Sequence, residues 1–500
     1  MGKESFKMSV WAPELRSERT TMFKILGMYF VLMTVAVWAL LSVFWGSTYK
    51  LEYYFPNIKV YIYDFDSVGS SSPLLGPTVQ ASLLATVGQR PYLTFIGRDT
   101  AGKTLDMVAH EVIEEKAWAA VVINANATTS WQAAMDGTGG LLNGEWSPQG
   151  AISIMISGAR WFQVTLEYLN PYLQQFVQSP VLQASHQAAA SYLSSATPAT
   201  LGALSSTQQA ALASPFAFQT IDLRPIHDDQ WAGAAPLEAG LIYYIIFSFH
   251  ITLFLFFARI PFQGAMKKKG IKLTWLNVCL LRIVPCWIAY FFLSLWYSLI
   301  NKAFLLPTDG NGYADFGPQG GFMIYWMLNW LTLASLGLAM ESMLTLLTLK
   351  FLPLFLITWI LLNITSSFFP ATLAEHFYKY GYAMPFYHAT TATKHILWGA
   401  RDRLALNFGV LAAWALLSMV TLSLFELMWR RKQEREARQA SSGADEESGS
   451  SGSGDGADDR EGESEGHARP HEKTPRIVQR KVQGPVRDQE GSVVGAPRGQ

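Results

Sequence analysis

Five long apolar segments follow one another closely in the second half of the chain. As a helix, each is long enough to cross a hydrocarbon core of roughly 30 Å. None shows the alternation of a membrane β-strand, and a helix satisfies its own backbone hydrogen bonds in lipid. The sequence therefore predicts an α-helical integral membrane protein. The predicted spans are Leu241–Ala258, Leu276–Ile300, Phe322–Leu349, Phe351–Phe369 and Leu404–Trp429.

A further apolar segment, Ile25–Trp45, lies near the N-terminus. Basic residues precede it and no small-residue cleavage site follows it, so we expect an uncleaved signal anchor behind a cytosolic arm at residues 1–24. The connection Arg259–Lys272 carries five basic residues and no acid, which predicts a cytosolic position. Six transmembrane helices, one followed by five, then leave both termini in the cytosol. Residues 370–403, predicted to lie outside, carry four basic residues and fit this topology less well.

Residues 46–240 are less hydrophobic than the predicted spans on either side. Their number is large enough for one globular domain, which the predicted topology places outside the cytosol. Its first half has an α/β pattern, whereas the Ala-, Ser- and Gln-rich stretch Gln183–Ser214 fits either two polar helices or a stalk. Residues 430–500 form the cytosolic tail, and we expect Gln439–Gln500 to be disordered because it has almost no large apolar side chain to bury. The predicted strands are 57–66, 92–96, 118–124 and 151–157, with a helix at 104–116.

Two asparagines stand in N-glycosylation sequons. Asn126 begins Asn-Ala-Thr in the predicted extracytosolic domain, so we expect it to be glycosylated. Asn363 begins Asn-Ile-Thr inside a predicted span, where we expect no glycan.

The stretch Gly97–Thr104 reads Gly-Arg-Asp-Thr-Ala-Gly-Lys-Thr, which is the spelling of a phosphate-binding loop. Such a loop also needs an acidic residue after a later strand, and the strand at 118–124 ends in asparagine instead. The predicted topology places the stretch away from cytosolic ATP. We therefore interpret it as a polar turn capping a helix and expect no enzyme activity, cofactor, metal centre or catalytic residue. A charged fraction of 15% gives no basic surface for nucleic acid.

We single out three ionisable residues within the predicted spans: His250, Arg282 and Glu341. Each is costly in hydrocarbon unless it is paired or faces a cavity. Counted along their helices, all three lie at similar depth in the inner leaflet. They form either a polar cluster that marks a substrate route or gate, or a structural Arg282–Glu341 pair with a snorkelling arginine.

Several stretches resemble the fungal nitrosoguanidine-resistance family, which is similar to type-2 ABC exporter permeases and the bacterial phage-infection-protein group. The resemblance covers about residues 25–430 and implies one span, a large extracytosolic domain and five spans. It also implies a role at the plasma membrane in tolerance of toxic compounds or in membrane organisation. At Lys394-His395 the chain departs from the family pattern. The stretches that carry the resemblance are Phe44-Trp45-Gly46-Ser47, Asp222-Leu223-Arg224-Pro225, Gly240-Leu241-Ile242-Tyr243, the segment 334–341 with Gly337 and Glu341, and the segments 363–370 and 377–387.

These observations favour a non-enzymatic plasma-membrane protein that exports small toxic molecules or alters lipid organisation. The alternatives are a structural or regulatory scaffold whose extracytosolic domain binds a partner or the cell wall, and an enzyme that uses the Gly97–Thr104 turn. The expected partners are membrane lipids and a small toxic or lipid-like substrate, with homo-oligomerisation left open.

Overall fold

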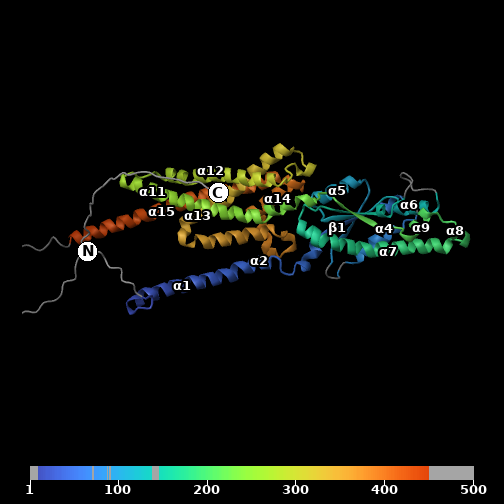
Figure 1. Cartoon of the computed structure of the whole chain (residues 1–500), viewed down its shortest axis with the longest axis horizontal. Coiled ribbons are helices and arrows are strands. Elements are labelled where there is room, and N and C mark those ends of the chain that lie inside the picture. The colour runs from blue at the N-terminus through green and yellow to red at the C-terminus, as the bar shows by residue number, and fades with distance from the viewer. Residues whose placement is uncertain (1–8, 70–71, 87, 89–91, 138–145, 450–500) are drawn as a thin grey trace, which may run out of the picture. The chain divides into compact units, whose positions relative to one another are not determined.

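The computed structural model describes residues 9–69, 72–86, 88, 92–137 and 146–449. Within these residues, five helices are long and apolar enough to cross a membrane: Pro13–Thr48, Ala239–Lys268, Trp275–Ala303, Pro318–Ser367 and Leu404–Gln439. All contacts described below lie within one compact unit that ends at Arg435. The helices of the apolar regions and the outer connection are α1 (Arg16–Ala36), α2 (Ser42–Gly46), α11 (Ala239–Lys268), α12 (Trp275–Ala303), α13 (Pro318–Ser367), α14 (Pro385–Trp398) and α15 (Leu404–Gly449) (Figure 1).

The 50-residue helix α13 contains the predicted span Phe322–Leu349 and, except for its last two residues, the predicted span Phe351–Phe369. Its helical geometry breaks at Thr348, which has φ 63° and ψ 168°. A β-branched residue adopts a positive φ only under constraint, so the break marks a sharp reversal two residues before Lys350, the expected hairpin. A count of six spans remains a prediction.

The last helix differs from its prediction at its C-terminal end. The final span was expected to end at Trp429, but α15 continues to Gly449. The predicted disorder from Gln439 is therefore wrong for residues 439–449, which are helical. Arg, Lys, Gln, Glu and Ala dominate residues 430–440, and these residues favour helix even without an apolar face. Residues 441–449, which are rich in Ser, Gly and acids, continue the helix, and their composition does not explain it. The rest of the predicted tail, residues 450–500, and residues 1–8 of the predicted arm lie outside the described residues.

Between the first two apolar helices, a five-stranded sheet has the order β2-β1-β3-β4-β5. All neighbouring pairs are parallel except β3 and β4. Strand β3 is buried at all five positions, as expected of a strand covered on both faces. The strands are β1 (Lys59–Asp64), β2 (Thr94–Arg98), β3 (Ala119–Ile123), β4 (Ile152–Ile156) and β5 (Phe218–Asp222).

Helices cover both faces of this sheet. The larger core lies where α4 and α7 pack against each other and against the strands. The smaller core joins α5 to Tyr61, Tyr63 and Met155. Helices α7, α8 and α9 occupy the Ala- and Ser-rich half, so this region is helical. The remaining helices are α3 (Asp66–Gly69), α4 (Leu75–Ala85), α5 (Leu105–Ile113), α6 (Ala127–Met135), α7 (Asn170–Ser195), α8 (Pro198–Gly202), α9 (Ser206–Ala213) and α10 (Ala234–Leu237).

Helix α14 joins the sheet domain to the long apolar helices. Lys394 Nζ donates to Arg160 O at 2.9 Å and lies 3.6 Å from the centroid of the Trp161 ring. Arg224 Nε donates to Gly399 O at 2.7 Å. Several side chains from distant parts of the sequence thus hold the two regions together.

Two acidic residues that follow α5 form ion pairs with two of the basic residues in the predicted outer segment. Arg401 Nε lies 3.3 Å from Glu114 Oε2, and Arg403 Nη2 lies 3.6 Å from Glu115 Oε2. The domain thus supplies counter-charges to two of the four basic residues of this segment, and the side of the membrane on which the segment lies stays a prediction.

The first apolar helix contacts the rest of the chain mainly through its C-terminal end. Within α1, no residue is buried. Tyr378 Oη donates to Val43 O at 2.9 Å, and the Phe44 and Phe368 rings lie 5.8 Å apart. Three of the stretches that carry the family resemblance therefore meet at this end.

Candidate functional site

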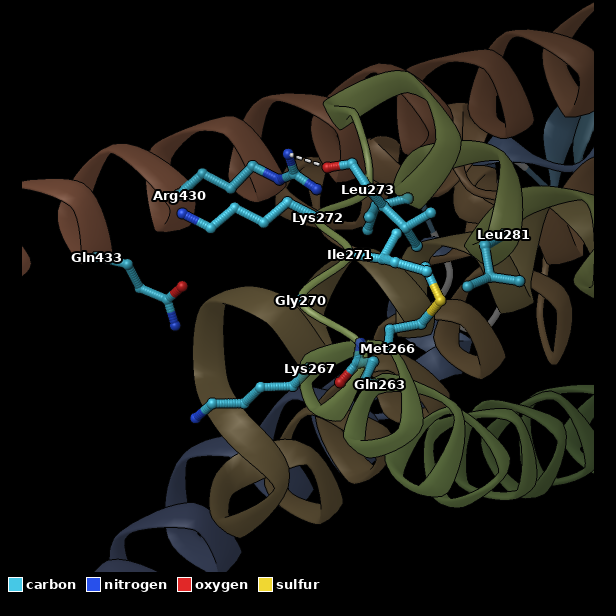
Figure 2. Close-up of a pocket in the computed structure, with 11 residues that line it drawn as sticks. Gln263, Met266, Lys267, Gly270, Ile271, Lys272, Leu273, Leu281, Arg430 and Gln433 are labelled. Atoms are coloured by element: carbon cyan, nitrogen blue, oxygen red, sulfur yellow. Dashed lines mark hydrogen bonds between the residues drawn. The ribbon is translucent and has the colours of Figure 1, made fainter.

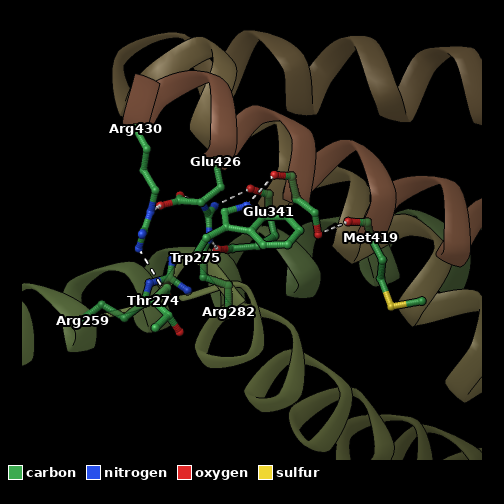
Figure 3. Close-up of polar contacts among 9 residues, drawn as sticks. Arg259, Thr274, Trp275, Arg282, Glu341, Met419, Glu426 and Arg430 are labelled. Atoms are coloured by element: carbon green, nitrogen blue, oxygen red, sulfur yellow. Dashed lines mark hydrogen bonds and ion pairs between the residues drawn. The ribbon is translucent and has the colours of Figure 1, made fainter. Parts of the chain in front are cut away.

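Charged side chains from four helices form a buried ionic cluster (Figure 3). Glu341 Oε1 on α13 accepts hydrogen bonds from Arg282 Nε on α12 and Arg259 Nη2 on α11, both at 2.8 Å. Arg282 Nη2 also donates to Glu341 O at 2.9 Å, and its Nη1 lies 3.2 Å from Glu426 Oε2 on α15. Arg430 Nε lies 3.3 Å from Glu426 Oε1. We call these five side chains the ionic cluster.

Burial makes this cluster energetically important. Glu341 is 0% exposed and Arg282 is 7% exposed, so neither charge is solvated by bulk water. Removing one partner of a buried pair typically costs about 3–5 kcal/mol because the other charge is left uncompensated. The cluster therefore holds α11, α12, α13 and α15 in one arrangement.

The structure brings the predicted residues Arg282 and Glu341 into direct contact, but it does not bring His250 to them. His250 is exposed, and its Nδ1 lies 2.8 Å from Ile246 O of the same helix. Nine residues separate His250 from Arg259 on α11, which is about two and a half helical turns. The two side chains consequently point to opposite faces, and similar depth was not sufficient to predict contact.

Three members of the cluster were missed by the sequence analysis: Glu426, Arg259 and Arg430, the last of which was assigned to the cytosolic tail that begins at residue 430. Glu426 lies inside the predicted span Leu404–Trp429, and a complete count of ionisable residues in the spans would have found it. Arg259 was assigned to the cytosolic connection because the second span was expected to end at Ala258. Helix α11 continues to Lys268, so Arg259 remains within the helix.

A row of buried polar side chains continues from the cluster along α12. Its members are three or four residues apart and so share one helix face. Asn301 Nδ2 donates to Tyr325 Oη at 2.8 Å, and Asn329 Nδ2 donates to Ser298 Oγ at 2.9 Å. We call this row, with the facing residues of α11 and α13, the polar seam. It comprises Cys286, Tyr290, Ser294, Ser298 and Asn301 of α12, Tyr244, Ser248 and Thr252 of α11, and Tyr325, Asn329 and Thr332 of α13.

Several buried polar atoms of the cluster and seam lack a hydrogen bond of good geometry among the described residues: Tyr244 Oη, Thr252 Oγ1, Tyr290 Oη, Arg259 Nη1 and Glu341 Oε2. The hydroxyl groups of Tyr290 and Thr252 nevertheless lie near each other, as do those of Tyr244 and Tyr297. A buried polar group without a partner is unfavourable, so a seam with several such groups is suited to receive polar atoms of another molecule.

A pocket of about 490 Å³ opens beside the ionic cluster (Figure 2). It lies between the end of α11, the start of α12 and α15. Arg430 belongs to both features, because it lines the pocket and its guanidinium also contacts Glu426 and Leu273 O.

The Gly97–Thr104 stretch forms a turn whose polar groups are engaged within the domain. Lys103 Nζ lies 2.6 Å from Glu111 Oε1. Thr104 Oγ1 accepts from Met107 N at 3.3 Å and so caps α5. This geometry agrees with the interpretation as a helix-capping turn. Lys103 and Thr104 also border a second pocket, of about 690 Å³, beside the ends of β1 and β3.

The two sequon asparagines lie in different surroundings. Asn126 is partly exposed at the start of α6, while Thr128 of the same sequon is buried and its Oγ1 donates to Asp66 Oδ2 at 2.5 Å. Attachment of a glycan at Asn126 would therefore have to precede folding of this segment. Asn363 is 0% exposed, and its Oδ1 accepts from Phe386 N at 3.3 Å.

Among the residues that the structure describes, no group of three or more His, Cys, Asp or Glu side chains could hold a metal ion. The apolar helices and the buried ionic cluster define a multi-pass helical membrane protein that carries an α/β domain.

The chain belongs to the family described as "Protein of unknown function (DUF3533)", whose model matches residues 29–420. It is similar to a Saccharomyces cerevisiae protein named as an uncharacterized endoplasmic reticulum membrane protein. The two are 25% identical over 464 residues, which cover 86% of this chain and 84% of the relative. No solved structure matches the chain.

Proposed function

We propose that the protein acts without enzymatic catalysis as a permease-like membrane protein that contributes to resistance to toxic small molecules. It would do so by exporting them or by changing lipid organisation. The observation that carries this proposal is the buried polar seam that ends at the Arg282–Glu341 contact. Polar side chains are costly inside a membrane and commonly line substrate or ion pathways. The resemblance to permease-like resistance proteins supports the same role.

The hydroxyl groups of the seam that lack a well-formed hydrogen bond support a route more than a purely structural contact. A structural seam gains most when every polar group is satisfied, whereas a route needs groups that can exchange partners. A small amphiphilic molecule could offer polar atoms to Tyr290 and Thr252 while its apolar part contacts the surrounding helices. Membrane lipids and small toxic or lipid-like molecules are therefore the proposed partners, with no role for nucleic acid. Self-association remains open.

Reconstitution into liposomes tests this function. Efflux of a fluorescent cationic amphiphile such as rhodamine 6G would be followed with and without an imposed proton gradient. We expect Tyr290→Phe to reduce the rate and His250→Gln to leave it unchanged, since His250 lies outside the seam. Equal rates in protein-containing and empty liposomes, both for the dye and for labelled phospholipid, would refute the proposal.

A scaffold role is the second candidate. The pocket of about 690 Å³ in the α/β domain favours it, because a partner or a cell-wall component could bind there. This role predicts that a Trp146→Ala change in the pocket wall abolishes function while the seam variants retain it. The reconstitution assay separates the two, since a scaffold moves no dye.

For localisation, we propose the plasma membrane with both termini cytosolic. The yeast relative is named as an endoplasmic reticulum protein, so the two membranes need to be distinguished directly. Fractionation of a tagged full-length chain would place it, and loss of a glycosidase-sensitive shift in Asn126→Gln would establish the side of the α/β domain. A shift that persists in this variant would contradict the proposed orientation.

A further inference from the structure

The pocket beside the ionic cluster combines unpaired cations with an apolar wall. Its polar rim contains Lys267, Lys272 and Arg430, with the amides of Gln263 and Gln433. None of the eleven described residues that line it is acidic. Five apolar side chains form the rest of the lining: Met266, Ile271, Leu273, Val278 and Leu281.

The backbone explains why these groups line the same pocket. Helix α11 ends at Lys268 and is followed by Gly270, whose φ of 69° suits glycine, and Ile271 N donates back to Met266 O at 3.0 Å. This reversal carries the chain directly into α12, whose first turn is capped by Thr274. Lys267 before the reversal and Lys272 after it consequently lie on the rim of the same pocket (Figure 2).

The cations differ in how far they are already neutralised. Arg430 donates to Leu273 O at 3.2 Å and to Glu426 Oε1 at 3.3 Å. Neither Lys267 nor Lys272 has an ion-pair partner within the part of the chain that the structure describes. The pocket therefore has an unneutralised positive charge next to apolar side chains that border the apolar helices.

We propose that this pocket binds the phosphate headgroup of an anionic phospholipid, with the upper acyl chains against Ile271 and Leu281. A basic pocket between helix ends at a membrane surface is suited to such a headgroup. Ammonium and guanidinium groups bind phosphate oxygens through charge-assisted hydrogen bonds. This site is inferred from its own lining residues, without use of the polar seam or the proposed transport role.

Bound phosphate would also reach the ionic cluster through Arg430. A phosphate that accepts from Arg430 competes with Glu426 for the same guanidinium. Lipid binding would thus change the contacts between α15 and Arg282, and the protein would respond to the anionic lipid content of its leaflet.

The test uses purified full-length protein in a neutral detergent, titrated with lipid and followed by native mass spectrometry. Dioleoyl phosphatidic acid is the anionic probe and dioleoyl phosphatidylcholine is the neutral one. Soluble sn-glycerol 3-phosphate carries the same phosphate without acyl chains. We expect phosphatidic acid to bind at least tenfold more tightly than either of the others.

Two double variants with the same loss of charge locate the site. Lys267→Gln with Lys272→Gln removes two lining cations, and we expect an affinity loss of roughly 30-fold, since each cation near phosphate contributes about fivefold. Lys268→Gln with Lys269→Gln removes two exposed cations of the same connection that do not line the pocket, and should change affinity less than about threefold. All four side chains are exposed, so both variants should fold, which a thermal unfolding curve checks.

Equal losses in the two double variants would overturn the proposal in favour of general electrostatic attraction. Equally tight binding of glycerol 3-phosphate would also overturn it, because the ligand would then be a soluble phosphate. Equal binding of phosphatidylcholine would show that the headgroup charge is not recognised.

Discussion

The α/β domain and the helical bundle place polar and apolar side chains in opposite ways. In the domain, the centre of the sheet is apolar, and β3 is buried at every position. In the bundle, Glu341 is 0% exposed whereas Phe254, Trp296 and Leu416 are 60–64% exposed. Burying apolar surface drives folding in water, but lipid is as apolar as leucine, so helices associate through packing and polar contacts. Buried polar groups in the bundle should therefore matter more than polar contacts in the domain.

The largest expected effect is the loss of Glu341. Glu341→Gln leaves Arg259 and Arg282 without their shared carboxylate, which should destabilise the protein by about 3–5 kcal/mol. Adding Arg282→Gln should recover part of this loss. Thermal unfolding in detergent of both single variants and the double variant gives the coupling energy. Purely additive losses would contradict the view that this contact holds the bundle together.

A pH-dependent effect is expected at Lys394, between the two regions. The pKa of this ammonium group is lowered from its ordinary 10.5 to about 7, mainly by burial; Glu115 and Glu238 oppose the shift and Arg160 adds to it. From about pH 7 to 10, the unfolded state holds more protons than the folded state at this group. The contribution of Lys394 to stability should therefore rise with pH across this window.

Replacement of Lys394 by methionine tests that dependence. The stability of Lys394→Met relative to the unchanged protein should be highest near pH 6, where burial of the charged amine is unfavourable, and lower near pH 9. Unfolding temperatures of the two proteins across this range would show the difference. A gap that is constant with pH would mean that the buried amine does not titrate there.

A smaller effect is expected where α12 and α13 pack most closely. A Cβ atom at Gly337 would collide with the hydroxyl and ring of Tyr290, so Gly337→Ala should cost about 1–3 kcal/mol. Gly264 is a control on α11 because nothing lies within 4 Å of a Cβ there. Gly264→Ala should be neutral or stabilising. Similar unfolding temperatures for the two variants would argue against close contact.

The smallest effect is expected for a polar contact of the domain. Lys103→Ala removes the ion pair with Glu111, whose side chains are 30% and 14% exposed. Such a pair contributes at most about 1 kcal/mol. Isothermal titration with ATP should show no binding to either protein. ATP binding that is lost in the variant would instead assign Gly97–Thr104 to nucleotide recognition.

Much of the fold could be predicted because burial leaves a clear pattern in the sequence. The runs that became β1, β3 and β4 are apolar or alternating, and each was predicted to within a few residues. Strand β5 was missed because Gln219, Thr220 and Asp222 give it a polar composition and it is only partly buried. An edge strand of this kind gains its hydrogen bonds from β4, which is distant in sequence.

The candidate site was only partly predictable. Charge and depth were sufficient to pair Arg282 with Glu341. They could not show the direction in which His250 points, because that depends on which face of α11 packs against its neighbours. The spacing of Cys286, Tyr290 and Ser294 is visible in the sequence, but the facing residues on α11 and α13 follow only from the packing of the helices.

The hydrogen bond between Tyr378 and Val43 joins residues 335 positions apart. At about 5–20 residues per second, on the order of 20–60 s separate the synthesis of the first helix from that of its partner. During this interval the first helix has to remain in the membrane without the contact that later positions it. Packing of the N-terminal helix against the rest of the protein is therefore a late step of biogenesis, because it can occur only after most of the chain has been synthesised.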